Sequence, residues 1–260
     1  MEVIVVESEA EMARIAADAV EHLVESTEFP VLGLATGSSP LPVYTDLIER
    51  HRSRGLSFAG TTMFLLDEYA GLARDHPQSF ATFIRDRFSG HVDVRPESVH
   101  GPDGDAADLA AACVRYESQI VDAGGIDLQL LGIGSEGHIG FNELASSLSS
   151  RTRLKTLTDR TRSDNARFFD VAEGVPRHAL TQGIGTILEA RHIVLLASGS
   201  SKSIAIERAV EGPVTAMVPA SALQLHPHVT VIVDDLAASR LRHADYYRAA
   251  YRDKPPWQRI

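Results

Sequence analysis

The sequence predicts an α/β protein built on a mostly parallel β-sheet with helices on both faces, and three observations support this class. Short apolar runs rich in β-branched residues alternate along the chain with amphipathic stretches. Most of the short runs are apolar without interruption, as strands covered on both faces are. The length of 260 residues, 44% hydrophobic and 23% charged, suits one domain with a sizeable core.

The first predicted unit is a strand over residues 3–6, followed by a helix that begins near Ser8. Ser8 and Glu11 have capping-box spacing, and apolar side chains then recur at helical spacing at Met12, Ile15, Ala19 and Leu23. Further strands are predicted over residues 31–35, 62–66, 128–133, 192–197 and 229–233. Helices are predicted over residues 41–54, 79–88, 106–123, 202–210 and 237–242.

The chain is predicted to be a single domain over residues 1–260, because no fixed-period repeat and no Gly/Ser or Pro linker divides it. The stretch from about 146 to 185 has a different character. It is polar and rich in Ser, Thr and Arg, and it interrupts the strand rhythm, which resumes at His192. We interpret it as a lid insertion over one end of the sheet.

Charge and composition exclude several classes of partner. The formal charge of −10 argues against nucleic acid, whose phosphate backbone needs a basic surface. No apolar run approaches the roughly 20 residues that a bilayer crossing needs, so no membrane partner is expected. Cys113 is the single cysteine and the first ten residues do not resemble a signal peptide, which indicates a cytoplasmic protein.

Two loops that follow predicted strands have the composition of phosphate sites. Ligands bind beyond the carboxyl ends of parallel strands, so the residues after each apolar run carry the most information. Thr36-Gly37-Ser38-Ser39-Pro40 follows one strand and opens a helix, where backbone N–H groups and hydroxyls can hold an anion. Ser198-Gly-Ser-Ser-Lys202 repeats the arrangement and adds a lysine. The pair favours a phosphorylated ligand.

Acidic residues follow the strand predicted over residues 62–66. Asp67 and Glu68 come directly after it, at a position where local structure does not require carboxylates. They are either a solvated helix cap or part of a site.

The segment from Gly132 to Glu143 is the most informative. Gly132, Gly134 and Gly137 form a G-x-G-x-x-G pattern, but no later strand ends in an acidic residue at the distance that a dinucleotide site needs. We therefore reject NAD binding. Glu136 and Glu143 bracket His138, an arrangement that suits a general acid/base relay.

Other chemistries fit the residues less well. A zinc site would need a third donor, and the chain has no H-E-x-x-H motif and one thiol. The close pair His226 and His228 is not expected to bind metal, and no G-x-S-x-G nucleophile elbow occurs.

Seven motifs together resemble the glucosamine/galactosamine-6-phosphate isomerase family over nearly the whole chain. They are Leu34-Ala-Thr-Gly-Ser-Ser-Pro40, Leu66-Asp-Glu-Tyr-Ala-Gly-Leu72, Gly132-Ile-Gly-Ser-Glu-Gly-His-Ile-Gly-Phe-Asn-Glu143, Ser150-Arg-Thr-Arg-Leu-Lys-Thr156, Asn165-Ala-Arg-Phe-Phe169, Ala179-Leu-Thr-Gln-Gly183 and Ser221-Ala-Leu-Gln-Leu-His226. The resemblance implies a Rossmann-like fold, an amino sugar phosphate as substrate and no metal or organic cofactor. The family's deaminases convert D-glucosamine 6-phosphate and water into D-fructose 6-phosphate and ammonia.

The resemblance also implies roles for individual residues. Asp67 would move the proton between C2 and C1, and Glu68 would have no such role. His138 would open the sugar ring, with Glu136 and Glu143 orienting and charging it. The phosphate would be held by Gly37, Ser38, Ser39, Arg167 and Lys202. Two separate proton-transfer sites suit a reaction that first opens a ring and then isomerises through an enol-type intermediate.

Some family members are hexamers activated by N-acetylglucosamine 6-phosphate, and part of their activator site is matched here by Ser146, Ser147, Arg153, Lys155 and Thr156. The alternative is that Arg153 and Lys155 are solvated charges flanking a strand. His192 stands at a position where the allosteric members carry a glutamate.

The catalytic loop departs from the family pattern at two places. Glu136 stands where Asp or Asn is usual, and Leu144 where proline is common. We expect Glu136 to hold the histidine from a backbone set slightly further back.

Three alternatives share the fold. A 6-phosphogluconolactonase would carry an arginine at Tyr69 and lack the Phe141-Asn-Glu143 ending. A galactosamine-6-phosphate isomerase is harder to separate, because the two sugars differ only at C4. A sugar-phosphate sensor of a transcription regulator would need a DNA-binding helix-turn-helix, and only two residues precede the first strand.

Overall fold

A computed structural model describes residues 1–166, 169, 174–255, 258 and 260. Its centre is a seven-stranded sheet in the order β1-β10-β9-β6-β2-β3-β5, with every neighbouring pair parallel. The predicted α/β class is therefore confirmed. In chain order, the strands are β1 (Glu2–Val6), β2 (Val31–Leu34), β3 (Thr62–Leu65), β5 (Val99–His100), β6 (Leu128–Gly132), β9 (His192–Ala197) and β10 (Val229–Asp234).

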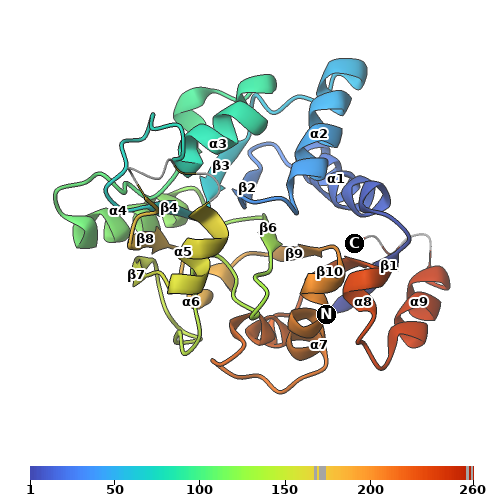
Figure 1. Cartoon of the computed structure of the whole chain (residues 1–260). Helices are drawn as coiled ribbons and strands as arrows, with labels where there is room; N and C mark the ends of the chain where they lie inside the picture. Colours follow the sequence, from blue (N-terminus) through green and yellow to red (C-terminus); the bar gives the residue numbers. More distant parts are fainter. Residues whose placement is uncertain (167–168, 170–173, 256–257, 259) are drawn as a thin grey trace.

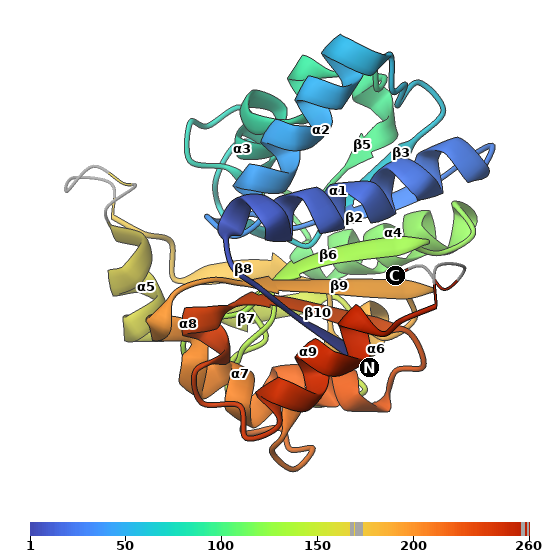
Figure 2. The same cartoon turned by 90° about the vertical axis from the view of Figure 1, so that its right-hand side faces the viewer.

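Helices cover both faces of this sheet (Figure 1, Figure 2). One face packs on α1 (Glu9–Ser26), α2 (Leu41–Arg54) and α3 (Phe80–Arg87). The other face packs on α4 (Leu109–Asp122), α6 (Ile184–Ile187), α7 (Ser203–Val210) and α8 (Asp235–Ala238). Successive strand residues point to opposite faces, so Leu32 joins the first core and Val31 the second.

Local sequence signals explain the first helix. Ser8 caps α1 by accepting the N–H of Glu11, as its position predicts. Met12, Ile15 and Ala19 are buried against the sheet. Glu11 accepts the N–H of Glu7 instead of completing the reciprocal half of a capping box.

A second, smaller sheet lies beside the first and consists of three antiparallel strands in the order β4-β8-β7. β4 (Asp67–Tyr69) follows β3 after one residue, and β7 (Arg153–Thr156) and β8 (His178–Thr181) come from the polar stretch of about 146–185. The same stretch supplies α5 (Asp159–Asn165). The sequence analysis predicted none of these strands.

The C-terminal helices differ from the prediction. The helix expected over residues 237–242 is the short α8, which begins after the cap Asp234 and ends at Ala238. An unpredicted helix, α9 (Ala244–Arg252), then packs against β1. After it, Lys254 pairs with Glu2 at 2.7 Å between Nζ and Oε2.

The strand order changes direction between β2 and β6. The chain adds β3 and β5 on one side of β2, and then places β6, β9 and β10 on the other side. Such a reversal leaves a crevice at the carboxyl ends of the two central strands. The loops that begin at Ala35 and Ile133 both lie at this crevice.

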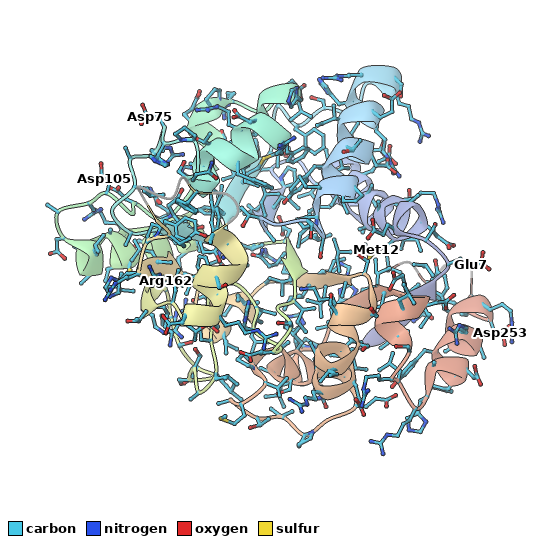
Figure 3. All side chains as sticks on the ribbon, viewed as in Figure 1. Glu7, Met12, Asp75, Asp105, Arg162 and Asp253 are labelled. Atoms are coloured by element: carbon cyan, nitrogen blue, oxygen red, sulfur yellow. The ribbon has the colours of Figure 1, made fainter. Side chains whose placement is uncertain are left out.

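The acidic side chains labelled in Figure 3, Glu7, Asp75, Asp105 and Asp253, are all exposed and project outward. The negative net charge is thus carried at least in part by solvated carboxylates. No helix in the described part of the chain is long and apolar enough to cross a membrane.

Candidate active site

A cleft of about 1210 Å³ lies at the carboxyl ends of the central strands. It gathers residues from six parts of the chain, one of which is the segment of α3 and the residues just before it. Its polar lining includes Thr36, Gly37, Ser38 and Ser39 after β2, Asp67 on β4, Ser135 and His138 after β6, Arg160, Thr161 and Asn165 on α5, and Ser201 and Lys202 after β9. The fold therefore brings together six residues expected from the sequence: Gly37, Ser38, Ser39, Asp67, His138 and Lys202.

Four of the five predicted phosphate residues, Gly37, Ser38, Ser39 and Lys202, line the cleft. Gly37 has a φ of 95°, a left-handed conformation that glycine adopts without strain, and it turns the chain from β2 towards α2. Lys202 ends the 3₁₀-helix η4 (Ser200–Lys202), and its Nζ donates to the carbonyl of Ile133 at 2.7 Å. Arg167 lies outside the described residues.

Asp67 is 5% exposed and begins β4, where it pairs with Thr181 of β8. Burial, together with the neighbouring charge of Glu68, raises the pKa of Asp67 well above its usual range, and the N–H of Phe141 opposes this shift in part. A buried carboxyl that lines a cleft and binds protons more tightly than usual is suited to act as a base towards a weakly acidic C–H group.

Glu68 has a structural role that the sequence analysis did not identify. Its side chain is buried rather than solvated, and it accepts the N–H groups of Tyr69, Phe80 and Ala81, each at 2.9 Å. Phe80 and Ala81 begin α3, so Glu68 anchors the first turn of that helix to β4. Of the two interpretations left open, the solvated cap is wrong for Glu68, because Glu68 caps a helix that starts twelve residues later and does so away from water.

The glycine-rich loop folds back on itself to hold His138. The N–H of Gly134 donates to the carbonyl of His138 at 2.9 Å. The imidazole lies against Gly134 so closely that an added Cβ would be 2.2 Å from its Nε2. Gly137 has a φ of 86°, again in the left-handed region. The glycines therefore shape a loop around a histidine, which explains their spacing without a dinucleotide.

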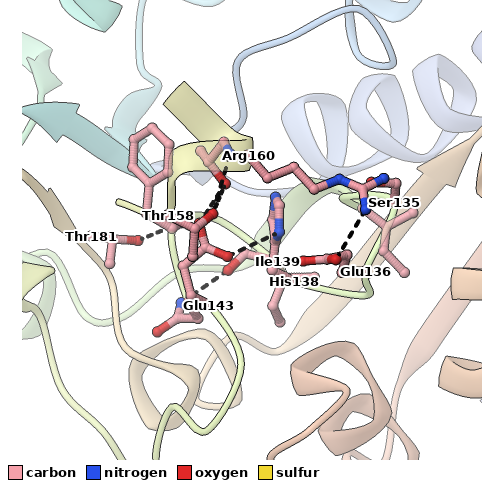
Figure 4. Close-up of polar contacts among 12 residues, drawn as sticks. Ser135, Glu136, His138, Ile139, Glu143, Thr158, Arg160 and Thr181 are labelled. Carbon is pink, nitrogen blue, oxygen red and sulfur yellow. Dashed lines mark hydrogen bonds and ion pairs between the residues drawn. The ribbon is translucent and has the colours of Figure 1, made fainter. Parts of the chain in front are cut away.

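Glu143 lies beside His138 and is held by hydroxyls from α5 (Figure 4). Its Oε2 is 3.6 Å from His138 Nδ1, and it is 4% exposed. Its Oε1 accepts from Thr161 Oγ1 at 2.5 Å and from Thr158 Oγ1 at 3.4 Å. The His138–Glu143 pair that the motif predicts is thus formed in the structure.

Glu136 has a partner that the sequence analysis did not anticipate. Its Oε1 accepts from Arg160 Nη1 at 3.1 Å, and the same guanidinium donates to Ser135 Oγ at 3.1 Å (Figure 4). The longer side chain of glutamate therefore has an observed contact with α5 at this position.

The five residues matched to an activator site are only partly brought together. Arg153 and Lys155 alternate on β7 and are half-buried on the same side of the strand, whereas Thr156 is exposed on the other. Desolvation lowers the pKa of Lys155, and the charge of Arg153 lowers it further. Ser146 is buried and Ser147 is exposed. Among the described residues, Ser146 Oγ and Arg153 Nη2 are buried without a hydrogen-bond partner.

Sequence reasoning missed several polar residues of the cleft, among them Arg160 and Thr161 on α5 and Asp86 and Arg87 on α3. Arg160 and Thr161 are the ones that contact the loop of His138 and Glu143. The only signal for them is the spacing of Thr158 and Thr161, in which Thr158 caps α5 by accepting the N–H of Thr161. Within the described ranges, no group of three or more His, Cys, Asp or Glu side chains is arranged to hold a metal ion.

The chain matches a protein-family model described as glucosamine-6-phosphate isomerases/6-phosphogluconolactonase over residues 6–232. It is 56% identical over 258 residues to a glucosamine-6-phosphate deaminase of Arthrobacter sp. (strain FB24), covering 99% of each chain. It is 57% identical over 260 residues to the deaminase of Beutenbergia cavernae, again covering 99% of each.

Two solved structures are also similar to this chain. A monomeric glucosamine-6-phosphate deaminase has a TM-score of 0.90 at 45% identity, covering 92% of this chain and 100% of that one. A 6-phosphogluconolactonase from Trypanosoma cruzi has a TM-score of 0.72 at 21% identity, covering 93% and 97%, and this likeness concerns the fold alone.

Proposed function

The chain belongs to the glucosamine-6-phosphate isomerase/6-phosphogluconolactonase family, and on that premise we propose that it converts D-glucosamine 6-phosphate and water into D-fructose 6-phosphate and ammonia. The observation that carries the proposal is the presence of Asp67 and His138 in one cleft with Ser38, Ser39 and Lys202. This set supplies two proton-transfer groups and a phosphate site, as an aldose–ketose isomerisation requires.

Ring opening comes first. His138 takes the proton from the C1 hydroxyl and returns a proton to the ring oxygen as the C1–O5 bond breaks, which gives the open-chain aldehyde. The carboxylate of Glu143 beside Nδ1 stabilises the imidazolium that forms between the two transfers. Glu136 belongs to the same loop, and we assign it a supporting role there.

Isomerisation and deamination follow. Asp67 removes the proton from C2 while the substrate's ammonium group passes a proton to O1, which gives an enolamine. The protonated Asp67 then delivers its proton to C1, which leaves a protonated imine at C2. Water adds to this carbon and ammonia leaves, giving the ketone of fructose 6-phosphate. Each positioned proton-transfer group contributes on the order of 10²- to 10⁴-fold in rate. In this proposal, none of these steps uses a metal ion.

The phosphate is held, in this proposal, by the loop of Gly37, Ser38 and Ser39 and by Lys202, with Arg167 as a further ligand. We also propose that residues of about 146–185 act as a lid on a single domain. Support comes from α5, which belongs to this stretch and lines the cleft with Arg160, Thr161 and Asn165. Closure would exclude water from the enolamine.

A second ligand site is proposed at β7. The two half-buried cations Arg153 and Lys155, with the buried Ser146 and with Ser147 and Thr156 nearby in sequence, suit an anion such as the phosphate of N-acetylglucosamine 6-phosphate. Activation through this site and assembly into a homo-oligomer remain proposals, and the solved relative at 45% identity is described as monomeric. The lone Cys113 supports the proposed cytoplasmic location.

The test of the reaction measures ammonia and fructose 6-phosphate released by the purified, EDTA-treated protein. We expect rapid turnover of glucosamine 6-phosphate and none by Asp67→Asn. Galactosamine 6-phosphate and 6-phosphogluconolactone are assayed in parallel, and preferential turnover of either would overturn the assignment. Addition of N-acetylglucosamine 6-phosphate then tests activation, with Lys155→Gln as the variant that should lose it.

A further inference from the structure

The first turn of α5 is bonded to the carboxylate that faces the imidazole. Thr161 Oγ1 donates to Glu143 Oε1 at 2.5 Å, and both side chains are buried, at 6% and 4% exposed. Thr158 Oγ1 lies 3.0 Å from Thr161 Oγ1 and 3.4 Å from Glu143 Oε1. Thr158, which caps α5, and Thr161 lie 15 and 18 residues beyond Glu143 in sequence, so the contact depends on tertiary structure.

The two oxygens of Glu143 have different partners, and this determines how its carboxylate is oriented. Oε1 is occupied by hydroxyls of α5, and Oε2 is the oxygen 3.6 Å from His138 Nδ1. A carboxylate with one oxygen fixed cannot rotate freely about its terminal bond. The hydroxyl of Thr161 therefore sets where the other oxygen points.

We infer that Thr161 is a positioning residue that acts through Glu143 on His138, so that the placement of α5 controls ring opening. The inference rests on the proposed function. Hydrogen bonds to a charged group contribute more than neutral ones, and a misplacement of about 1 Å at a catalytic group can cost on the order of 10²-fold in rate. Thr161 touches neither the sugar nor its reacting atoms in this account.

Other charges near the pair do not replace this contact. Lys155 on β7 is a partly desolvated cation, and the charge of Glu143 raises its pKa against that desolvation. Arg160, next to Thr161 on α5, points instead to Glu136 and Ser135 (Figure 4). Asp67 lines the same cleft with its own negative charge when ionised.

The experiment compares Thr161→Val, which removes the hydroxyl at nearly constant shape, with Thr161→Ser, which keeps it. Thr186→Val is the matched control, because the buried Thr186 donates in the same way to Glu117 at 2.6 Å and does not line the cleft. The readouts are kcat and KM for glucosamine 6-phosphate, and the imidazole titration of His138 in ¹⁵N-histidine-labelled protein, assigned with His138→Gln.

We expect Thr161→Val to lower kcat by about tenfold or more with little change in KM, as loss of orientation at the reacting group does. Its His138 titration midpoint should fall, because a less well-placed carboxylate stabilises the imidazolium less. Thr161→Ser and Thr186→Val should resemble the native protein in both readouts.

The inference is overturned if Thr161→Val matches Thr186→Val in kcat and in the titration midpoint. If Thr161→Val does not fold, Thr161→Ala removes the same hydroxyl on a better helix former and is judged by the same two readouts. Failure of the proposed function is a separate outcome: the native protein would then lack turnover, while the titration would still test the coupling of Thr161 to His138.

Discussion

Gly134 leaves the space that the imidazole of His138 occupies. We expect Gly134→Ala to lower kcat by on the order of 10²-fold, because the new methyl would meet the far end of the ring at 2.2 Å and turn it out of place. The ring can move away, so the free energy of unfolding should change little. Steady-state kinetics and urea denaturation of the same variant check both parts. A native kcat would contradict the account.

Protonation of Asp67 should cause the loss of kcat/KM at low pH. Because burial and Glu68 raise its pKa, Asp67 takes up a proton at a higher pH than an ordinary aspartate. Only the ionised form acts as a base, so kcat/KM should fall as pH decreases through a midpoint well above the usual value of about 4. A profile that stays flat down to about pH 4 would exclude Asp67 as the base in this environment.

Arg160 and Glu136 should behave as one unit. Both are partly exposed, with side chains 57% and 34% accessible, so their pair contributes at most about 1 kcal/mol to stability. We expect Arg160→Gln and Glu136→Gln to change kcat/KM to similar extents, and the double variant to lose little more than either. A double-mutant cycle measures this, and strictly additive losses would show that the pair is not coupled.

Asp67, Ser39 and His138 could be predicted because each follows a strand of a parallel sheet, where chain order alone determines which end of the sheet a residue occupies. Arg160 and Thr161 could not. They lie in a polar segment without apolar periodicity, and they reach the catalytic loop through contacts that span 18 to 25 residues.

At the scale of elements, Glu68 links β4 to α3 through three backbone N–H groups. Glu68→Gln should lower the free energy of unfolding by about 1–3 kcal/mol, because an amide nitrogen cannot accept the bond from Ala81. Urea denaturation checks this. The exposed Glu25→Gln on α1 is the control and should change stability by no more than about 0.5 kcal/mol. Equal effects of the two substitutions would contradict the anchoring role.

Six of the seven strands of the main sheet were predictable, whereas the two-residue β5 and the strands of the small sheet were not, for a physical reason. β2 and β9, for example, are buried along their whole length and consist almost entirely of apolar residues. β5 is too short and too exposed to give such a run. In β7 the usual pattern is inverted: Leu154 is 44% exposed, whereas Arg153 and Lys155 are half-buried. Such a strand has no apolar face for a sequence pattern to reveal.

At the scale of the whole molecule, a histidine pair should make the fold acid-sensitive. The rings of His192 and His228 stack with centroids 3.8 Å apart. Burial, with smaller contributions from nearby positive groups, lowers the pKa of His192 to about 3. The unfolded chain binds this proton below about pH 6.5, so stability should decrease as pH falls from there towards 3.

The measurement is the urea midpoint of the native protein and of His192→Gln at pH 7 and pH 5. The stability of the native protein should fall more steeply than that of the variant. Parallel decreases would mean that other groups, the carboxylates included, account for the acid response.

The pairing of β1 with β10 has a consequence for how the protein is made. Glu2 lies opposite Thr230, so β1 has no neighbouring strand until more than two hundred further residues have been added to the growing chain. At typical synthesis rates of about 5–20 residues per second, this wait lasts on the order of ten seconds or more. During that time the valine-rich β1 lacks its partner strand β10. The edge of the main sheet at β1 can therefore be completed only after most of the chain has been synthesised.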